Sequence, residues 1–232
     1  MSGIPSVIVF DVNETLSDMA PMAGRFKDLG APELLAKLWF ATLLRDGFAL
    51  TASGGNGRFA DIGAEVLRGL LPGFALNRGV DDAVAYVMQG MTGLTVHPDV
   101  AEGIHTLKAA GFRLVTLTNG GTNVAENLFA AAGIRDEFEL LLSVEDAPAW
   151  KPAHTSYDYA AAACGVSADE MLLVAVHPWD INGASRAGLG TAWLNRDGAR
   201  YPGYFTAPDH TVRTLLDLPG ALTSLGTGAR EV

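Results

Sequence analysis

Acidic, basic and amide side chains follow several short apolar segments of this sequence. A buried carboxylate beside a lysine can act as an ionised nucleophile, and a second carboxylate can act as a base. If the apolar segments are parallel strands, the side chains that follow them meet at one edge of the sheet, where such folds bind ligands. We therefore expect one site made from four groups: Asp11 with Asn13 and Thr15, Thr118 with Asn119, Lys151, and His177 with Asp180.

Each of these residues also has a purely structural interpretation. Asp11 could cap a turn, as aspartate often does. Lys151, which precedes Pro152, could be a solvated loop cation. Asp180 could be the N-cap of a helix. Only their shared position after apolar segments favours a common site over these alternatives.

The elements that would position these residues follow from the hydrophobic pattern. Continuous apolar runs are typical of strands that are covered on both faces. Such runs alternate with helical spacing, which predicts a doubly wound α/β core with a parallel, Rossmann-like sheet. The expected strands are 6–10, 113–118, 139–143, 171–176 and 190–194, and the expected helices are 100–110, 123–132, 157–163 and 181–187.

Residues 17–95 interrupt this alternation. The stretch has helical spacing over 32–45, 57–71 and 81–89, and no convincing strand. We expect a helical cap domain of residues 17–95, inserted after the first strand. Residues 1–16 and 96–232 would then form the core domain, with the cap over the carboxyl ends of its strands.

Composition narrows the class of protein. The 232 residues are 49% hydrophobic and 18% charged, so they can form a compact core. A net charge of −10 disfavours nucleic acid and anionic membranes as partners. The single cysteine, Cys164, cannot form an internal disulfide. No apolar run is long enough to span a bilayer, and the first residues do not read as a secretory signal, so we expect a cytoplasmic protein.

Four motifs together resemble those of the haloacid dehalogenase superfamily. They are FDVNETL at 10–16, LTNG at 117–120, KP at 151–152 and WDINGA at 179–184. They occur in the family's order along the whole chain, with the predicted cap between the first and the second. Most members of the superfamily are magnesium-dependent phosphatases, which carry a second aspartate two residues after the nucleophile. Here that position is Asn13, whose amide cannot act as a general acid.

The sequence instead resembles the L-2-haloacid dehalogenases (type II haloacid dehalogenases). Arg45, Tyr157 and the pair Trp179–Asp180 match positions of that family. The resemblance implies hydrolysis of short (S)-2-haloalkanoates to (R)-2-hydroxyalkanoates and free halide, including haloacetates such as fluoroacetate. It implies no metal, no cofactor and a homodimer. A magnesium-dependent phosphatase of the same fold and a catalytically silent binding module are the alternatives.

The resemblance also implies a role for each site residue. Asp11 would attack C2 of the substrate, Lys151 would keep Asp11 ionised, Arg45 would pair with the departing halide, and Asp180 would be the base that activates water. Thr15, Thr118 and Asn119 would hold the substrate carboxylate, Tyr157 would orient Lys151 or Asp180, and Asn13 and Trp179 would complete the substrate-binding set. His177 replaces an amide residue of the family and could donate to halide or assist the base. The structural alternatives are a surface cation for Arg45, aromatic packing for Tyr157 and a structural histidine at 177.

Overall fold

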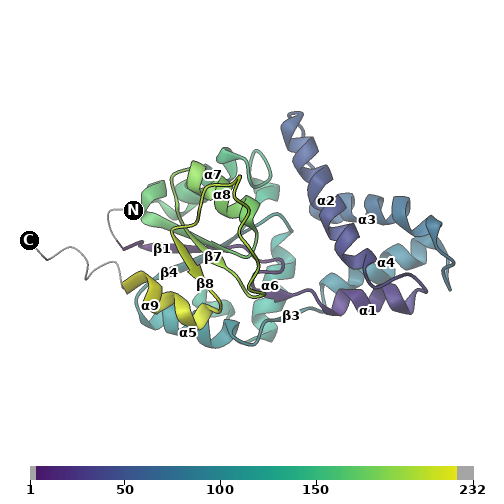
Figure 1. Ribbon diagram of the computed structural model, residues 1–232, viewed down its shortest axis with the longest axis horizontal. Coiled ribbons are helices and arrows are strands. Elements are labelled where there is room, and N and C mark those ends of the chain that lie inside the picture. The colour runs from purple at the N-terminus through teal and green to yellow at the C-terminus, as the bar shows by residue number, and fades with distance from the viewer. Residues whose placement is uncertain (1–3, 224–232) are drawn as a thin grey trace, which may run out of the picture.

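The computed structural model describes residues 4–223 and consists of two bodies (Figure 1). The larger body is built on a six-stranded sheet in the order β5-β4-β1-β6-β7-β8, and every neighbouring pair is parallel. The smaller body contains the helices between β2 and β3. The α/β fold with a helical cap inserted after the first strand is thus confirmed. The strands are β1 (Val7–Phe10), β4 (Arg113–Thr118), β5 (Leu140–Ser143), β6 (Met171–Ala175), β7 (Gly190–Leu194) and β8 (His210–Val212).

Strand β1 lies at the centre of the sheet, between β4 and β6. Phe10 is level with Thr116 on one side and with Val174 on the other. All four residues of β1 are buried, as expected for a strand that is covered on both faces. The residues that follow β1, β4 and β6 therefore leave the sheet side by side.

Helices cover both faces of the sheet. In Figure 1, α7 and α8 lie on one side of it and α5 and α9 on the other. Burial of the strands between these layers provides the main stabilisation of the core. The core helices are α5 (Val100–Ala109), α6 (Thr122–Ala131), α7 (His154–Cys164), α8 (Pro178–Arg186) and α9 (Leu218–Thr223). Short 3-10 turns occupy Leu71–Gly73, Arg135–Glu137, Val144–Asp146, Ala168–Glu170 and Leu215–Asp217.

The chain enters and leaves the cap through a short antiparallel pair, β2 (Ser17–Asp18) and β3 (Thr95–Val96). This pair lies where we expect the cap to begin and end, although the exact domain limits stay a prediction. Trp39, Phe26 and Leu43 are completely buried inside the cap, so it has an apolar core of its own. The cap helices are α1 (Pro21–Asp28), α2 (Leu35–Ala52), α3 (Phe59–Leu70) and α4 (Val80–Met91).

The expected strands and core helices are present, with ends that differ by a few residues. Helices α7 and α8 begin three residues earlier than their apolar spacing indicates, at His154 and Pro178. The hydrophobic pattern did not predict α1, α9, β8 or the β2–β3 pair. Strand β8 is only three residues long and is partly exposed, so it lacks the continuous apolar run by which the other strands were found.

Candidate active site

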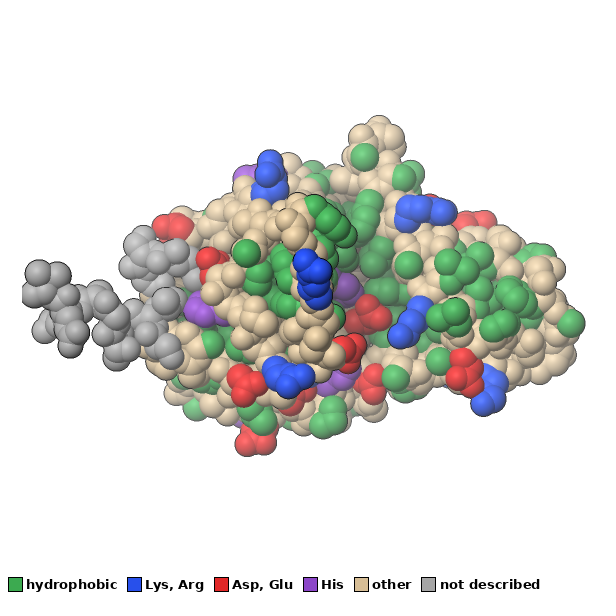
Figure 2. Space-filling view, in the orientation of Figure 1, with side chains coloured by type: hydrophobic (Ala, Val, Ile, Leu, Met, Phe, Trp, Pro, Cys, Tyr) green, Lys and Arg blue, Asp and Glu red, His purple; other side chains and the backbone are tan. Residues whose placement is uncertain are grey.

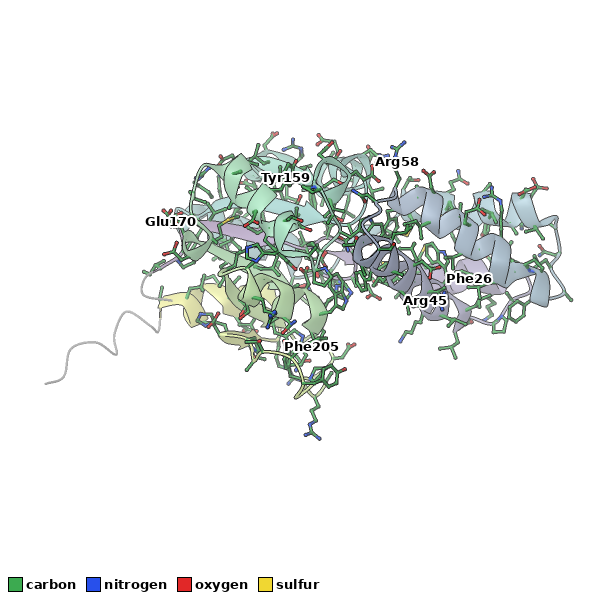
Figure 3. The ribbon with its side chains drawn as sticks, turned by 90° about the horizontal axis from the view of Figure 1, so that it is seen from above. Phe26, Arg45, Arg58, Tyr159, Glu170 and Phe205 are labelled. Carbon is green, nitrogen blue, oxygen red and sulfur yellow. The ribbon has the colours of Figure 1, made fainter. Side chains whose placement is uncertain are left out.

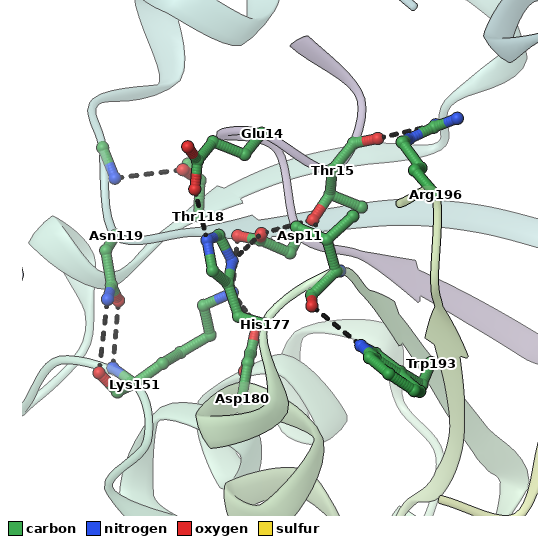
Figure 4. A network of polar contacts seen from close by, with 12 residues as sticks. Asp11, Glu14, Thr15, Thr118, Asn119, Lys151, His177, Asp180, Trp193 and Arg196 are labelled. Carbon is green, nitrogen blue, oxygen red and sulfur yellow. Dashed lines mark hydrogen bonds and ion pairs between the residues drawn. The ribbon is translucent and has the colours of Figure 1, made fainter. Parts of the chain in front are cut away.

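The carboxylate of Asp11 is the centre of a buried polar network (Figure 4). Asp11 directly follows β1, and its backbone N–H donates to the carbonyl oxygen of Val174 in β6 at 3.1 Å. The residue is almost completely buried. The central strand thus holds this carboxylate rigidly at the edge of the sheet.

Lys151 lies between two carboxylates. Its Nζ donates to Asp11 Oδ1 at 3.0 Å and to Asp180 Oδ2 at 2.6 Å, and its side chain is completely buried. The other oxygen of Asp180, Oδ1, accepts a hydrogen bond from the hydroxyl of Tyr157 at 2.6 Å. Both oxygens of Asp180 are therefore occupied, and its side chain is 0% exposed.

The side chain of Asn119 fixes the backbone of Lys151. Asn119 Oδ1 accepts from the Lys151 N–H at 3.0 Å, and Asn119 Nδ2 donates to the Lys151 carbonyl oxygen at 3.2 Å. Thr15 has a comparable role, since its hydroxyl donates to Asp11 Oδ2 at 2.6 Å and accepts from the Val176 N–H at 3.1 Å. Asn119 and Thr15 thus orient Lys151 and Asp11, and the substrate binding that we expected of them stays a prediction.

His177 joins the network from the end of β6. Its Nδ1 lies 3.1 Å from Asp11 Oδ2, and its Nε2 lies 2.9 Å from Glu14 Oε2. The imidazole stacks on Trp179, with 5.1 Å between ring centroids, and Phe40 of α2 lies 6.2 Å away on the same measure. Because both ring nitrogens face carboxylates, the arrangement favours the imidazolium form, in which both N–H groups donate.

The charges in this network shift one another's pKa values. Burial alone would raise the pKa of Asp11, but the Lys151 charge and the contacts with His177 and Thr15 outweigh it and lower the pKa below its usual range. Burial would likewise lower the pKa of His177, but its hydrogen bonds to Asp11 and Glu14 and their charges raise it to about 9. Burial raises the pKa of Asp180 against the opposing effect of Lys151. At neutral pH, Asp11 is thus an anion and His177 a cation.

Two cavities lie beside the network, one lined by a residue that contacts Asp11 and the other by residues that follow Asp11 in the chain. A cavity of about 490 Å³ is lined by Glu14, Phe40 and His177 and lies between cap and core. A smaller cavity of about 240 Å³ is lined by residues next to Asp11 and by α3 and α4 of the cap. Figure 2 shows apolar side chains gathered in the hollow between the two bodies. The walls of the smaller cavity include Val12, Asn13, Arg58, Phe59, Met88 and Thr118.

The structure does not bring Arg45 to this network, which corrects our expectation that it pairs with the halide. Its side chain is 71% exposed and its Nε pairs with Asp46 at 2.8 Å. Arg45 lies five residues after Phe40 on α2, which turns it by about 140° around the helix axis, away from the face that meets His177. Figure 3 shows Arg45 on the cap and Arg58 near the junction of cap and core.

Three residues near the network were not among the sequence-predicted site residues: Glu14, Arg58 and Phe59. Glu14 is three residues after Asp11 inside the first motif, and it has a positive φ of 61° that few non-glycine residues adopt. Arg58 and Phe59 begin α3 and line the smaller cavity. The sequence offered a signal for Glu14 alone, because it lies inside the first motif, whereas Arg58 and Phe59 lie outside all four motifs.

The charge of His177 should make its contribution to stability depend on pH. A pKa raised from about 6.5 to about 9 stabilises the fold fully below pH 6.5, and this stabilisation is lost as the pH rises to 9. We expect His177→Gln to lower the free energy of unfolding by roughly 3 kcal/mol at pH 6, and by much less above pH 9. Urea unfolding at both pH values measures this difference, and an equal loss at both would contradict it.

The space between the carboxylates of Asp11 and Asp180 is filled by the Lys151 ammonium group. Within residues 4–223, no group of three or more histidine, cysteine, aspartate or glutamate side chains has an arrangement that could hold a metal ion.

None of the helices in that part of the chain has the length and apolarity needed to cross a bilayer.

Comparison with known proteins decides the family. The family model for haloacid dehalogenase-like hydrolases matches residues 5–188. The chain belongs to this family. Among curated members, it is 30% identical to an (S)-2-haloacid dehalogenase (4A) of Burkholderia cepacia, over 90% of this chain and 91% of the relative. It is 36% identical to haloacetate dehalogenase H-2 of Moraxella sp. strain B, over about half of each chain (50% and 51%).

Solved structures of haloacid dehalogenase-like hydrolases agree with this family assignment. The L-2-haloacid dehalogenase of Xanthobacter autotrophicus, solved with chloropropionic acid covalently bound, superposes with a TM-score of 0.85. The two chains are 25% identical, and the match covers 97% of this chain and all of the other.

Proposed function

We propose that this protein hydrolyses the carbon–halogen bond of short (S)-2-haloalkanoates, producing (R)-2-hydroxyalkanoates and halide through an ester on Asp11. The observation that carries the proposal is the Asp11 carboxylate, which is buried and kept ionised by Lys151. The two residues that follow it, Val12 and Asn13, line a small, mostly apolar cavity. The relatives named above act on 2-haloacids and haloacetates, which supports the same substrate class here.

In the first step, one oxygen of Asp11 bonds to C2 of the substrate while the carbon–halogen bond breaks. Oδ2 already accepts hydrogen bonds from Thr15 and His177, whereas Oδ1 accepts one from Lys151. Oδ1 is thus the less encumbered oxygen, and we assign the attack to it. The halide leaves with the bonding electron pair from the opposite side of C2, which inverts that centre.

The substrate would bind in the 240 Å³ cavity. Phe59 and Met88 offer apolar walls for the alkyl group, and exclusion of water there strengthens the charge interactions at Asp11. Thr118, Asn13 and Arg58 line the same cavity and offer polar and positively charged groups to the substrate carboxylate and the departing halide. Trp179 packs on His177 and lines neither cavity, so we propose that it supports the site indirectly.

Halide release from L- and D-2-chloropropionate, with a chelator present, tests the proposal directly. We expect release from the L isomer alone and an R-hydroxyacid product. Release of chloride from chloroacetate and of fluoride from fluoroacetate, each measured with a halide electrode, defines the range of leaving groups. Strict dependence on added magnesium, together with hydrolysis of a generic aryl phosphate, would instead support the phosphatase alternative.

Variants of Arg45 and Arg58 test which of the two arginines acts on the substrate: Arg45, as the sequence resemblance implies, or Arg58, as the geometry favours. Because its guanidinium is exposed and paired with Asp46, we expect Arg45→Gln to leave kcat/KM within about twofold of wild type. Arg58 is also exposed, and its Nε lies 3.5 Å from Glu145 Oε2, but unlike Arg45 it lines the proposed substrate cavity. We therefore expect Arg58→Gln to raise KM about tenfold, since it removes a cation from the wall of that cavity. The opposite ranking of the two variants in steady-state halide release would restore the role first expected of Arg45.

We also propose that the protein acts in the cytoplasm as a homodimer. The resemblance to the L-2-haloacid dehalogenases and the lone cysteine, which suits a reducing compartment, support this proposal. Sedimentation equilibrium tests the assembly, with a single species of twice the chain mass as the expected result.

A further inference from the structure

The hydrolytic half of the reaction needs a base beside Asp11, and two side chains are candidates. Asp180 was our expectation, but both of its oxygens are held by Tyr157 and Lys151, and its side chain has no exposure. His177 contacts the reacting group directly, with Nδ1 3.1 Å from Asp11 Oδ2, and it lines the 490 Å³ cavity. Water can therefore reach His177 from this cavity, whereas Asp180 lines neither cavity at the site.

Glu14 holds the imidazole in the required orientation. Its Oε2 lies 2.9 Å from His177 Nε2, so the proton on Nε2 is fixed there and Nδ1 is directed at Asp11. The backbone of Glu14 is itself anchored, because His97 Nε2 donates to its carbonyl oxygen at 3.0 Å. On the other side, Trp179 stacks against the ring. A carboxylate that fixes the tautomer of a histidine next to a nucleophile is a recurring catalytic arrangement.

We propose that His177, positioned by Glu14, is the base that activates water for hydrolysis of the Asp11 ester. The inference rests on the proposed dehalogenation, because it concerns the second step of that reaction. It assigns His177 a catalytic role and makes Glu14 a positioning residue, while Asp180 serves to hold Lys151 beside Asp11.

The protons balance over the two steps. In the resting enzyme, His177 is an imidazolium between two carboxylates. Conversion of Asp11 to a neutral ester removes one of these negative charges, and the Nδ1 proton then leaves to solvent through the larger cavity. The overall reaction releases one proton with each halide, and this is that proton.

Neutral Nδ1 next takes a proton from water while the water oxygen bonds to the ester carbonyl carbon. Collapse of the tetrahedral intermediate breaks the bond from this carbon to the ester oxygen, which leaves with the product. The product alkoxide takes the proton of the newly formed carboxylic acid. Asp11 is thereby restored as a carboxylate and His177 as an imidazolium.

Other charged groups face the same region, and they define the background against which His177 titrates. Lys151 and Asp180 lie behind Asp11. The rest line the larger cavity with Glu14 and His177, and they are Asp18, Lys37, His97, Arg196, Asp197 and Arg200.

The test compares ester formation with ester hydrolysis in rapid-quench experiments on L-2-chloropropionate. We expect His177→Gln to release one halide per active site and then to stall, with steady-state turnover lower by about 100- to 10,000-fold. Mass spectrometry should find a carboxyethyl group on Asp11. Glu14→Gln should slow hydrolysis about tenfold and shift its rise with pH to lower pH, because His177 loses a negative partner.

His105 and Glu137 provide matched controls, since they form an exposed histidine–glutamate pair on the core at 3.0 Å. His105→Gln and Glu137→Gln should leave both steps unchanged. The inference is overturned if His177→Gln hydrolyses the ester at the wild-type rate while Asp180→Asn accumulates it. If His177→Gln fails to fold, it gives no halide burst, and an unshifted pH profile of Glu14→Gln then overturns the inference. Absence of halide release by wild-type enzyme would instead refute the proposed function.

Discussion

Asp11→Asn is expected to lower halide release from L-2-chloropropionate by about 10,000-fold or more, the scale on which loss of a nucleophile acts. An amide at this position keeps the size of the side chain but is a poor nucleophile. The ion pair with Lys151 that keeps Asp11 ionised in the wild-type protein is lost as well. No ester should form on the variant, so the first step fails along with the second.

Isotope labelling gives the decisive measurement for wild type. During many turnovers in water labelled with heavy oxygen, the label should enter the Asp11 side chain, because hydrolysis of the ester replaces one of its oxygens. Asp46→Asn, at a partly exposed site on the cap, is the matched control and should behave as wild type. Normal halide release by Asp11→Asn, or an Asp11 that never acquires label, would refute a covalent mechanism at this residue.

Lys151→Met is expected to have the largest effect on stability, about 3–5 kcal/mol at neutral pH. Methionine fills much of the same space, but the carboxylates of Asp11 and Asp180 then face each other in a buried site without a cation. Their mutual repulsion raises the pKa of these acids in the folded state. The lost stability should therefore be recovered in part as the pH falls and one carboxylate is protonated.

Urea unfolding at neutral and mildly acidic pH measures this effect. Lys27→Met is a suitable control, since Lys27 forms an exposed ion pair with Glu33 and the variant should keep nearly the stability of wild type. Equal losses for the two lysine variants would mean that Lys151 does not stabilise the network through its charge. Halide release should also fall sharply in Lys151→Met, because the nucleophile is no longer held ionised.

Much of the site could be predicted because it depends on where the strands end. The apolar runs at β1, β4 and β6 were visible in the sequence, and parallel strands deliver the residues that follow them to one edge. Asp11, Lys151, His177 and Asp180 were thus expected together, and the structure joins them in one chain of hydrogen bonds, from His177 to Asp11 to Lys151 to Asp180.

The direction of cap side chains could not be predicted in the same way. Helical spacing indicated a helix around Arg45, but only the packing of α2 on the core decides which face meets the site. That face presents Phe40, and Arg45 points elsewhere. Likewise, nothing local in the sequence specified that Arg58 and Phe59, at the start of α3, would line a cavity with Thr118.

The sequence by itself determined the class of fold, the order of its elements and the position of Asp11 at the end of the first strand, because hydrophobic periodicity and motif spacing are local properties of the chain. Only the tertiary structure decided the partners of these groups. Glu14 and His177 are 163 residues apart, and their contact exists because β1 and β6 are neighbours and Glu14 adopts a positive φ. The pairing of His177 with Glu14 is therefore a consequence of packing, which local sequence patterns do not encode.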